Sequence, residues 1–118
     1  MSLATKFMFE VKGIEEFVLN IPKEQMVHIY VNVYVEVDNF FIKIDDVDQE
    51  PPLKIYVYEN NHRIIVDKYF YFAGLVSFRG KADSTYTIRF YNTGNKKLIE
   101  ANQNNVLQTH QTEKLLEG

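Results

Sequence analysis

The chain has 118 residues, of which 46% are hydrophobic, 25% are charged and none is cysteine, and its formal net charge is −3. These values indicate one soluble globular domain with its own core. They exclude disulfides, thiol catalysis and cysteine-based zinc sites, and they give no electrostatic reason to expect nucleic acid as a partner. The lack of cysteine leans towards a reducing compartment such as the cytoplasm.

Extended segments in which apolar and polar residues alternate dominate the chain. The clearest is segment 29–37, IYVNVYVEV, where every odd position is aliphatic. The Val, Ile, Tyr, Phe and Thr of such segments suit a half-buried pleated surface. Eight strands are predicted in chain order, with a further candidate at 96–101: 6–11, 15–21, 26–37, 40–47, 53–60, 62–72, 75–79 and 85–92.

Turn residues separate these segments. Asp38 and Asn39 divide the third from the fourth, and ENNH at 59–62 is a predicted hairpin turn. NTGN at 92–95 is a second predicted hairpin turn, because Gly94 can adopt the positive φ that tight hairpins need.

Many short strands without intervening helices predict an all-β fold, an antiparallel, jelly-roll-like β-sandwich of about eight strands. The predicted domain spans residues 6–101, with the third, fifth and eighth segments as its core strands. Residues 102–118 are polar and are expected to form a C-terminal tail, either disordered or a short helix.

No pattern in the sequence predicts catalysis. The three histidines are far apart, no serine lies in a Gly-x-Ser-x-Gly motif, and the five glycines are scattered. We therefore expect a protein that is not an enzyme and uses no cofactor.

The densest acidic stretch is IDDVDQE at 44–50. Its Asp45, Asp46 and Asp48 are candidate calcium ligands, since calcium binds several carboxylate oxygens from one loop. Calcium held there would in turn attract phospholipid. The alternative is a solvated loop that keeps this end of the domain soluble.

If the aliphatic residues face inward, Tyr30, Tyr34, Tyr56, Tyr58 and Tyr91 face outward. Tyrosine is enriched at interfaces because it offers contact area at a low entropy cost. These side chains are candidates for binding a protein, a peptide or a sugar, although the absence of Trp weakens the sugar hypothesis. The alternative is cross-strand packing or a second buried face.

The stretch 74–92, GLVSFRGKADSTYTIRFYN, resembles the end of the Golgi-dynamics (GOLD) domain. That family shows Gly-x-Phe-Ser-Phe, a short loop, and then Gly-x-Tyr-x-aromatic-Cys-Phe-Ser-Asn. The matching residues are Gly74, Val76, Ser77, Phe78, Tyr86, Ile88, Phe90 and Asn92. Alternation along two strands lets the apolar members of this set share one core, and Asn92 can cap a turn.

The chain also departs from the family pattern. Ser84 stands where the family has glycine, and the two cysteines of its disulfide-bonded members fall on Glu16 and Arg89. A salt bridge between Glu16 and Arg89 is expected in place of that bond. The resemblance implies a non-enzymatic β-sandwich that mediates protein–protein contacts in cargo selection or adaptor assembly.

The sequence thus predicts a non-enzymatic protein-interaction or assembly module of GOLD-like type. It predicts a protein partner, allows a homo-oligomer, and gives only an indirect route to a membrane. Two alternatives stay open. One is a ligand-binding β-sandwich for calcium and phospholipid or for carbohydrate, and the other is a structural subunit of a larger assembly.

Overall fold

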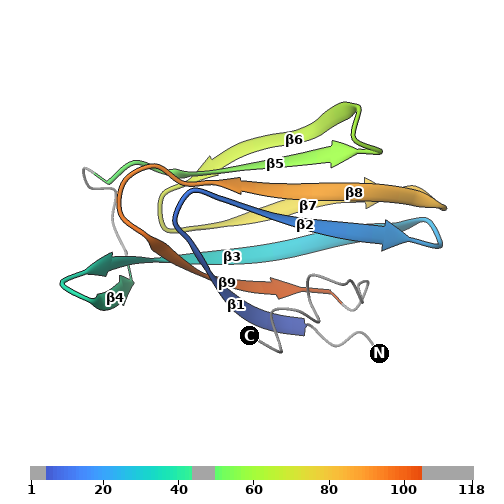
Figure 1. The fold of residues 1–118 in the computed structure, drawn as a ribbon. Helices are drawn as coiled ribbons and strands as arrows, with labels where there is room; N and C mark the ends of the chain where they lie inside the picture. The colour runs from blue at the N-terminus through green and yellow to red at the C-terminus, as the bar shows by residue number, and fades with distance from the viewer. Residues whose placement is uncertain (1–4, 44–49, 105–118) are drawn as a thin grey trace.

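The computed structural model describes residues 5–43 and 50–104, which form strands and the turns between them (Figure 1). The all-β prediction is confirmed. The described part of the chain contains no helix, and therefore no helix with the length and apolar character needed to span a membrane. Its nine strands are β1 Thr5–Val11, β2 Ile14–Ile21, β3 Gln25–Val37, β4 Phe40–Lys43, β5 Leu53–Glu59, β6 Arg63–Phe70, β7 Ala73–Gly80, β8 Ser84–Tyr91 and β9 Lys97–Gln103.

The predicted segments coincide with these strands, and the candidate at 96–101 is β9. The largest difference is at β4, which ends at Lys43, whereas the predicted strand 40–47 runs on into residues outside the described ranges. β9 extends to Gln103, two residues beyond the predicted domain boundary. The rest of the predicted tail, from residue 105, lies outside the described residues.

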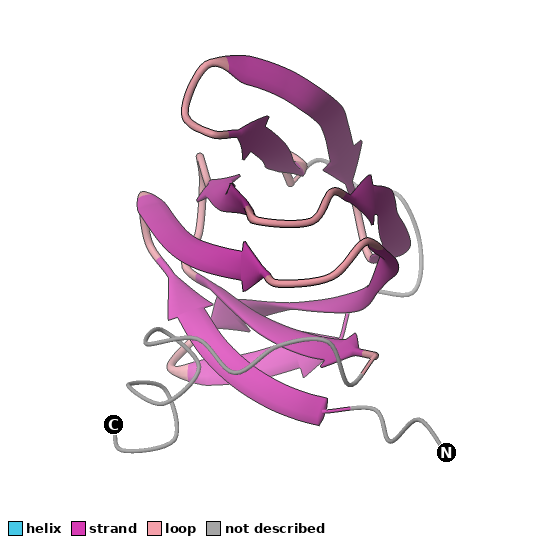
Figure 2. Ribbon diagram, turned by 90° about the vertical axis from the view of Figure 1, so that its right-hand side faces the viewer, coloured by secondary structure: helices cyan, strands magenta, loops and turns pink. Residues whose placement is uncertain are grey.

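The strands form two antiparallel sheets packed face to face (Figure 2). Sheet A begins with the order β1-β9-β3, so β9 pairs with one edge of β3. The other edge of β3 is shared by two strands: residues 25–32 pair with β7, and residues 34–37 pair with β4. Sheet B has the order β2-β8-β5-β6. With β4 set aside, two four-stranded sheets linked by repeated crossings make a jelly roll. β3, β5 and β8 each have neighbours on both edges, as predicted for the core strands.

Of the two predicted hairpin turns, one is correct and one is wrong. Asn60 and Asn61 have φ of 50° and 62° and join β5 to its neighbour β6, as the tight primed turns do. Residues 92–95 instead carry the chain from β8 in sheet B to β9 in sheet A. Gly94 does adopt a positive φ of 89°, because the chain reverses there, but the strands it joins do not pair with each other.

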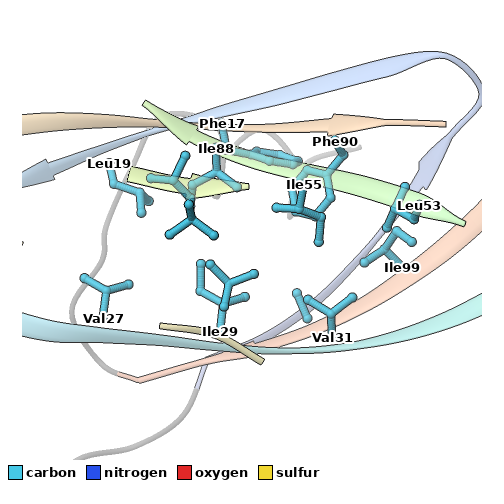
Figure 3. Close-up of a cluster of buried hydrophobic side chains, with 14 of the residues drawn as sticks. Phe17, Leu19, Val27, Ile29, Val31, Leu53, Ile55, Ile88, Phe90 and Ile99 are labelled. Carbon is cyan, nitrogen blue, oxygen red and sulfur yellow. The ribbon is translucent and has the colours of Figure 1, made fainter. Parts of the chain in front are cut away.

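The core lies between the two sheets, where side chains from β3 face those of β2, β5 and β8 (Figure 3). From Val27 to Val35 the odd residues of β3 are at most 4% exposed. Val37 is 41% exposed, so the predicted series of inward-facing residues ends at Val35, and Val37 lies in the hairpin with β4. A cluster of edge-to-face rings at one end joins Phe9, Phe17 and Phe90 at centroid distances of 4.7 to 5.8 Å.

The apolar residues of the GOLD-like motif all lie in this core. Val76, Phe78, Tyr86, Ile88 and Phe90 are each no more than 6% exposed. The hydroxyl of Tyr86 stays hydrogen-bonded despite its burial, since it accepts from Lys81 N at 2.8 Å and donates to Glu59 Oε2 at 3.3 Å. The predicted shared core of these two strands is therefore present.

Candidate functional site

The five outward tyrosines lie on two opposite faces of the sandwich. Tyr30 and Tyr34 belong to β3 and point away from the core on sheet A, whereas Tyr56 and Tyr58 on β5 and Tyr91 on β8 lie on the outer face of sheet B. Residues facing outward from two stacked sheets point in opposite directions. The five residues therefore cannot form one binding surface.

The three tyrosines of sheet B pack against one another. The rings of Tyr56 and Tyr91 meet edge to face, with centroids 5.4 Å apart and planes at 85°. The rings of Tyr56 and Tyr58 are 6.3 Å apart and tilted by 39°. All three side chains are half-buried, so each presents part of its ring to solvent in a fixed orientation.

Arg89 on β8 holds this cluster together. Its guanidinium carbon lies 4.8 Å from the ring centroid of Tyr58 and 5.9 Å from that of Tyr91, which is within cation–π range. Its Nη1 also donates a hydrogen bond to the Tyr91 hydroxyl at 3.2 Å.

The expected salt bridge between Glu16 and Arg89 is present. The two residues face each other across β2 and β8, and Arg89 Nε donates to Glu16 Oε2 at 2.6 Å. The Tyr91 hydroxyl and the Glu16 carboxylate raise the pKa of Arg89 above its ordinary value, so the guanidinium stays charged. Because both side chains are partly exposed, the pair itself stabilises the fold by no more than about 1 kcal/mol. Its effect is to orient the guanidinium over the tyrosines.

A depression of about 480 Å³ lies over these rings, and we call it the tyrosine groove. It follows β5, with β8 on one side and β6 on the other. Its lining residues are Pro52, Lys54, Tyr56, Tyr58, Ile64, Tyr91 and Thr93. Lys54 is exposed, and within residues 5–43 and 50–104 it makes no hydrogen bond or ion pair.

The tyrosines of sheet A are arranged differently. Tyr30 is 57% exposed, and Tyr34 is half-buried four residues further along β3. Neither ring stacks on another aromatic ring of the described residues. Between them, Asn32 Nδ2 donates to Glu100 Oε1 at 3.2 Å, so this part of the face is polar.

The candidate calcium ligands Asp45, Asp46 and Asp48 lie outside the described residues. In the part of the chain that is described, no group of three or more acidic or histidine side chains is placed to hold a metal ion. Glu50, from the same acidic stretch, is turned toward the protein. Its Oε1 accepts hydrogen bonds from Asn95 N at 2.8 Å and from Lys97 Nζ at 3.1 Å.

Lys97 is a fully buried lysine that the strand prediction did not single out. Its Nζ donates to Asn92 Oδ1 at 2.5 Å, to Glu50 Oε1 and to Thr93 O at 3.1 Å. Asn92 Nδ2 donates in turn to Val11 O and to Asn95 O, both at 2.9 Å, so its predicted capping role is present. The alternation Lys97, Ile99, Ala101 could have revealed that this lysine faces inward.

Gly94 is required in this network. Its φ is 89°, and a Cβ built there would lie 2.5 Å from Glu50 Oε1. Lys97, Glu50 and Asn92 thus tie together the β1–β2 turn, the start of the segment before β5 and the β8–β9 crossing. With its donors and acceptors satisfied internally, the network is structural.

One serine and one histidine also meet, on the outer face of sheet A. Ser77 Oγ lies 2.9 Å from His28 Nδ1, on neighbouring strands. Among the described residues no carboxylate bonds the imidazole to orient it. Within the described ranges, the pair therefore has no third group of the kind that activates a nucleophilic serine.

A scan of protein families finds no match for this chain, and a search of curated proteins finds none either.

Proposed function

We propose that the protein is a non-enzymatic protein-interaction module of GOLD-like type that binds its partner through the outer face of sheet B. The observation that carries the proposal is the tyrosine groove, with three packed tyrosines and a charged arginine fixed against them. Tyrosine and arginine are the residue types that most often dominate binding energy at protein interfaces. Rings that are already packed lose little freedom on binding.

The GOLD-like part of the proposal is supported by the positions of the motif residues. Its apolar members lie in the core of a jelly-roll sandwich, and Asn92 caps the turn after β8. Glu16 and Arg89, at the positions of the family's cysteines, are direct neighbours on β2 and β8. A contact at this place is compatible with either a disulfide or an ion pair.

Affinity purification from the cells that make the protein tests the proposal. The double variant Tyr56→Ala/Tyr58→Ala removes the centre of the tyrosine groove. Tyr30→Ala/Tyr34→Ala, on the opposite face, is the matched control. A partner that binds the wild type and the control is expected to be reduced about tenfold or more with the sheet B variant, as for loss of a binding hot spot.

Thermal unfolding of both variants verifies that they are folded, and calorimetry with the purified partner gives the affinity. Retention of every partner by the sheet B variant would contradict the proposal, as would losses that occur only with the sheet A variant.

A further inference from the structure

The tyrosine groove cannot take up a ligand as an added strand. Its floor is β5, whose backbone pairs with β8 on one edge and with β6 on the other. A peptide lying over the face of a fully paired strand meets side chains only. This favours a ligand conformation that needs no backbone partner, and polyproline II is the common one because it has no internal hydrogen bonds and a solvated backbone.

The groove offers the contacts that such a segment uses. Tyr56 and Tyr58 provide ring surface, and Pro52 and Ile64 lie at its two ends. The hydroxyls of Tyr56 and Tyr58 make no hydrogen bond to the described residues, so they are available to the carbonyls of a ligand. Proline-rich segments bind aromatic-lined grooves in this way.

The groove has one charged lining residue, Lys54. Lys54 lies in the groove without a partner in the described part of the chain, and the Arg89 guanidinium lies over the rings of Tyr58 and Tyr91. None of the described side chains that line it is acidic. Glu16 and Arg89 bind each other and add no net charge, and the exposed carboxylate of Asp67 lies on β6 opposite Tyr56 rather than opposite Lys54. An acidic residue in the ligand is therefore complementary to the Lys54 end.

The ring geometry favours a peptide over a carbohydrate. A sugar stacks best on an open, flat aromatic face. Here the Arg89 guanidinium lies over Tyr58, and Tyr56 meets Tyr91 at 85°. The rings therefore do not form one flat platform, which a pyranose needs more than a proline ring or an apolar side chain does.

From these contacts we infer that the tyrosine groove binds an extended acidic, proline-rich segment of the partner in polyproline II conformation. The inference rests on the proposed function and specifies its ligand. Lys54 and Tyr58 are four residues apart on an antiparallel strand, about 13 Å, which is the length of about four residues of polyproline II. One Pro-x-x-Pro unit therefore spans the rings, with an acidic residue beside it at Lys54.

Three peptide libraries test this inference on the purified protein by fluorescence polarisation. The first has the pattern Glu-Pro-x-x-Pro-Glu, the second replaces both prolines by alanine, and the third replaces both glutamates by lysine. A glutamate at each end of the peptide allows one of them to reach Lys54 whichever way the peptide runs along the groove. The first library is expected to bind about tenfold or more tightly than the other two, the scale of a lost hot-spot contact.

Variants then locate the binding. Tyr58→Ala should weaken binding of the first library about tenfold or more, and Lys54→Glu should reverse the preference in favour of the lysine library. Tyr30→Ala, on the opposite face, should change nothing. Lys54 is exposed, so its substitution leaves the fold intact.

Equal binding of the three libraries, or binding that ignores Lys54 and Tyr58, overturns the inference. So does an oligosaccharide from a glycan array that binds in a Tyr58-dependent manner while the first library does not. If the partner found by affinity purification still depends on Tyr56 and Tyr58 in these cases, the proposed function stands and only its ligand class is wrong. If no partner depends on them, both fail.

Discussion

Two lysines that are adjacent in the sequence have opposite environments. Lys97 is fully buried, with Asn92, Glu50 and a backbone carbonyl around its ammonium group. Lys96 is solvent-accessible and bridges Glu10 on β1 and Glu36 on β3, and these carboxylates raise its pKa. A buried ion pair contributes little relative to an apolar replacement of both partners, but loss of one partner leaves the other charge buried.

Lys97→Met is therefore expected to lower the free energy of unfolding by about 3 kcal/mol. The substitution keeps the length of the side chain and removes the cation that Glu50 and Asn92 contact. Urea denaturation followed by far-UV circular dichroism measures the loss. The matched control is Lys96→Met, whose partly exposed ion pairs should leave stability close to that of the wild type. Equal stability of both variants would show that the buried network does not hold the loops.

For single residues, the sequence predicts whether a side chain points inward or outward better than it predicts which residues the side chain contacts. The inward direction of Val76 and Phe90 and the outward direction of Tyr56 follow from alternation alone. The contacts of Lys97 do not follow from alternation, because Glu50 and Asn92 lie in different connecting segments that come together only in the folded chain. The Glu16–Arg89 pair is predictable only from the family resemblance, because nothing local in the sequence relates two residues so far apart.

Among the elements, β3 carries the largest share of the core. It lies between β9 and β7 in sheet A, and its inward side chains face those of sheet B across the interior. Val33 is fully buried at the middle of this strand, whereas Val37, on the same side four residues later, is partly exposed.

Val33→Asp is expected to unfold the domain, because it buries a carboxylate without a partner. Val33→Ala should stay folded with a loss of about 2 kcal/mol from the lost methyl groups and the cavity. Val37→Asp, the matched control, should cost about 0.5 kcal/mol or less, as for other exposed positions. Circular dichroism and urea titration distinguish the three variants. A folded Val33→Asp protein would contradict the placement of β3 at the core.

The connections between elements could be predicted only in part. Turn chemistry identified the reversals at 59–62 and 92–95, but both look alike locally, with asparagines and a requirement for positive φ. Whether the next strand pairs beside the last one or crosses to the other sheet depends on which neighbours complete each sheet. β2 already occupies the edge of β8 that β9 would need for a hairpin, and β5 occupies the other.

In the whole molecule, most strand pairs join distant parts of the chain. Within the described residues only β3–β4 and β5–β6 link consecutive strands, whereas β1 pairs with β9 and β2 pairs with β8. One core runs between the sheets, so the strands depend on each other for burial.

We therefore expect one cooperative unfolding transition and slow folding, in milliseconds to seconds, as is typical of all-β domains with non-local pairing. Tyrosine fluorescence is a suitable tertiary probe because the chain has no Trp and Tyr86 is buried. Its transition in urea should coincide with that of far-UV circular dichroism, and stopped-flow refolding should give the rate. Two separated transitions would mean that the sheets are independent units.

The strands and the sandwich class could be predicted from the sequence, because alternation with a period of two is a property of each strand on its own, whereas the order of the strands in the sheets could not. The candidate site could be predicted only in part. All five tyrosines were identified, but the selection of Tyr56, Tyr58 and Tyr91 depends on β5 and β8 being neighbours in sheet B, which is a result of the topology. Lys54 carries no local signal at all, and it becomes notable only because the groove places an unpaired ammonium beside those rings.

Alternate residues of β8 face the core and the outer surface of sheet B. Tyr86, Ile88 and Phe90 point inward, whereas Arg89 and Tyr91 lie on the outer face. Substitutions at Arg89 and Tyr91 would therefore change the surface of the groove without disturbing the hydrophobic layer beneath. The domain thus has the properties of a display scaffold. Randomising positions 54, 56, 58, 89 and 91 would diversify one contiguous patch while the framework keeps its shape.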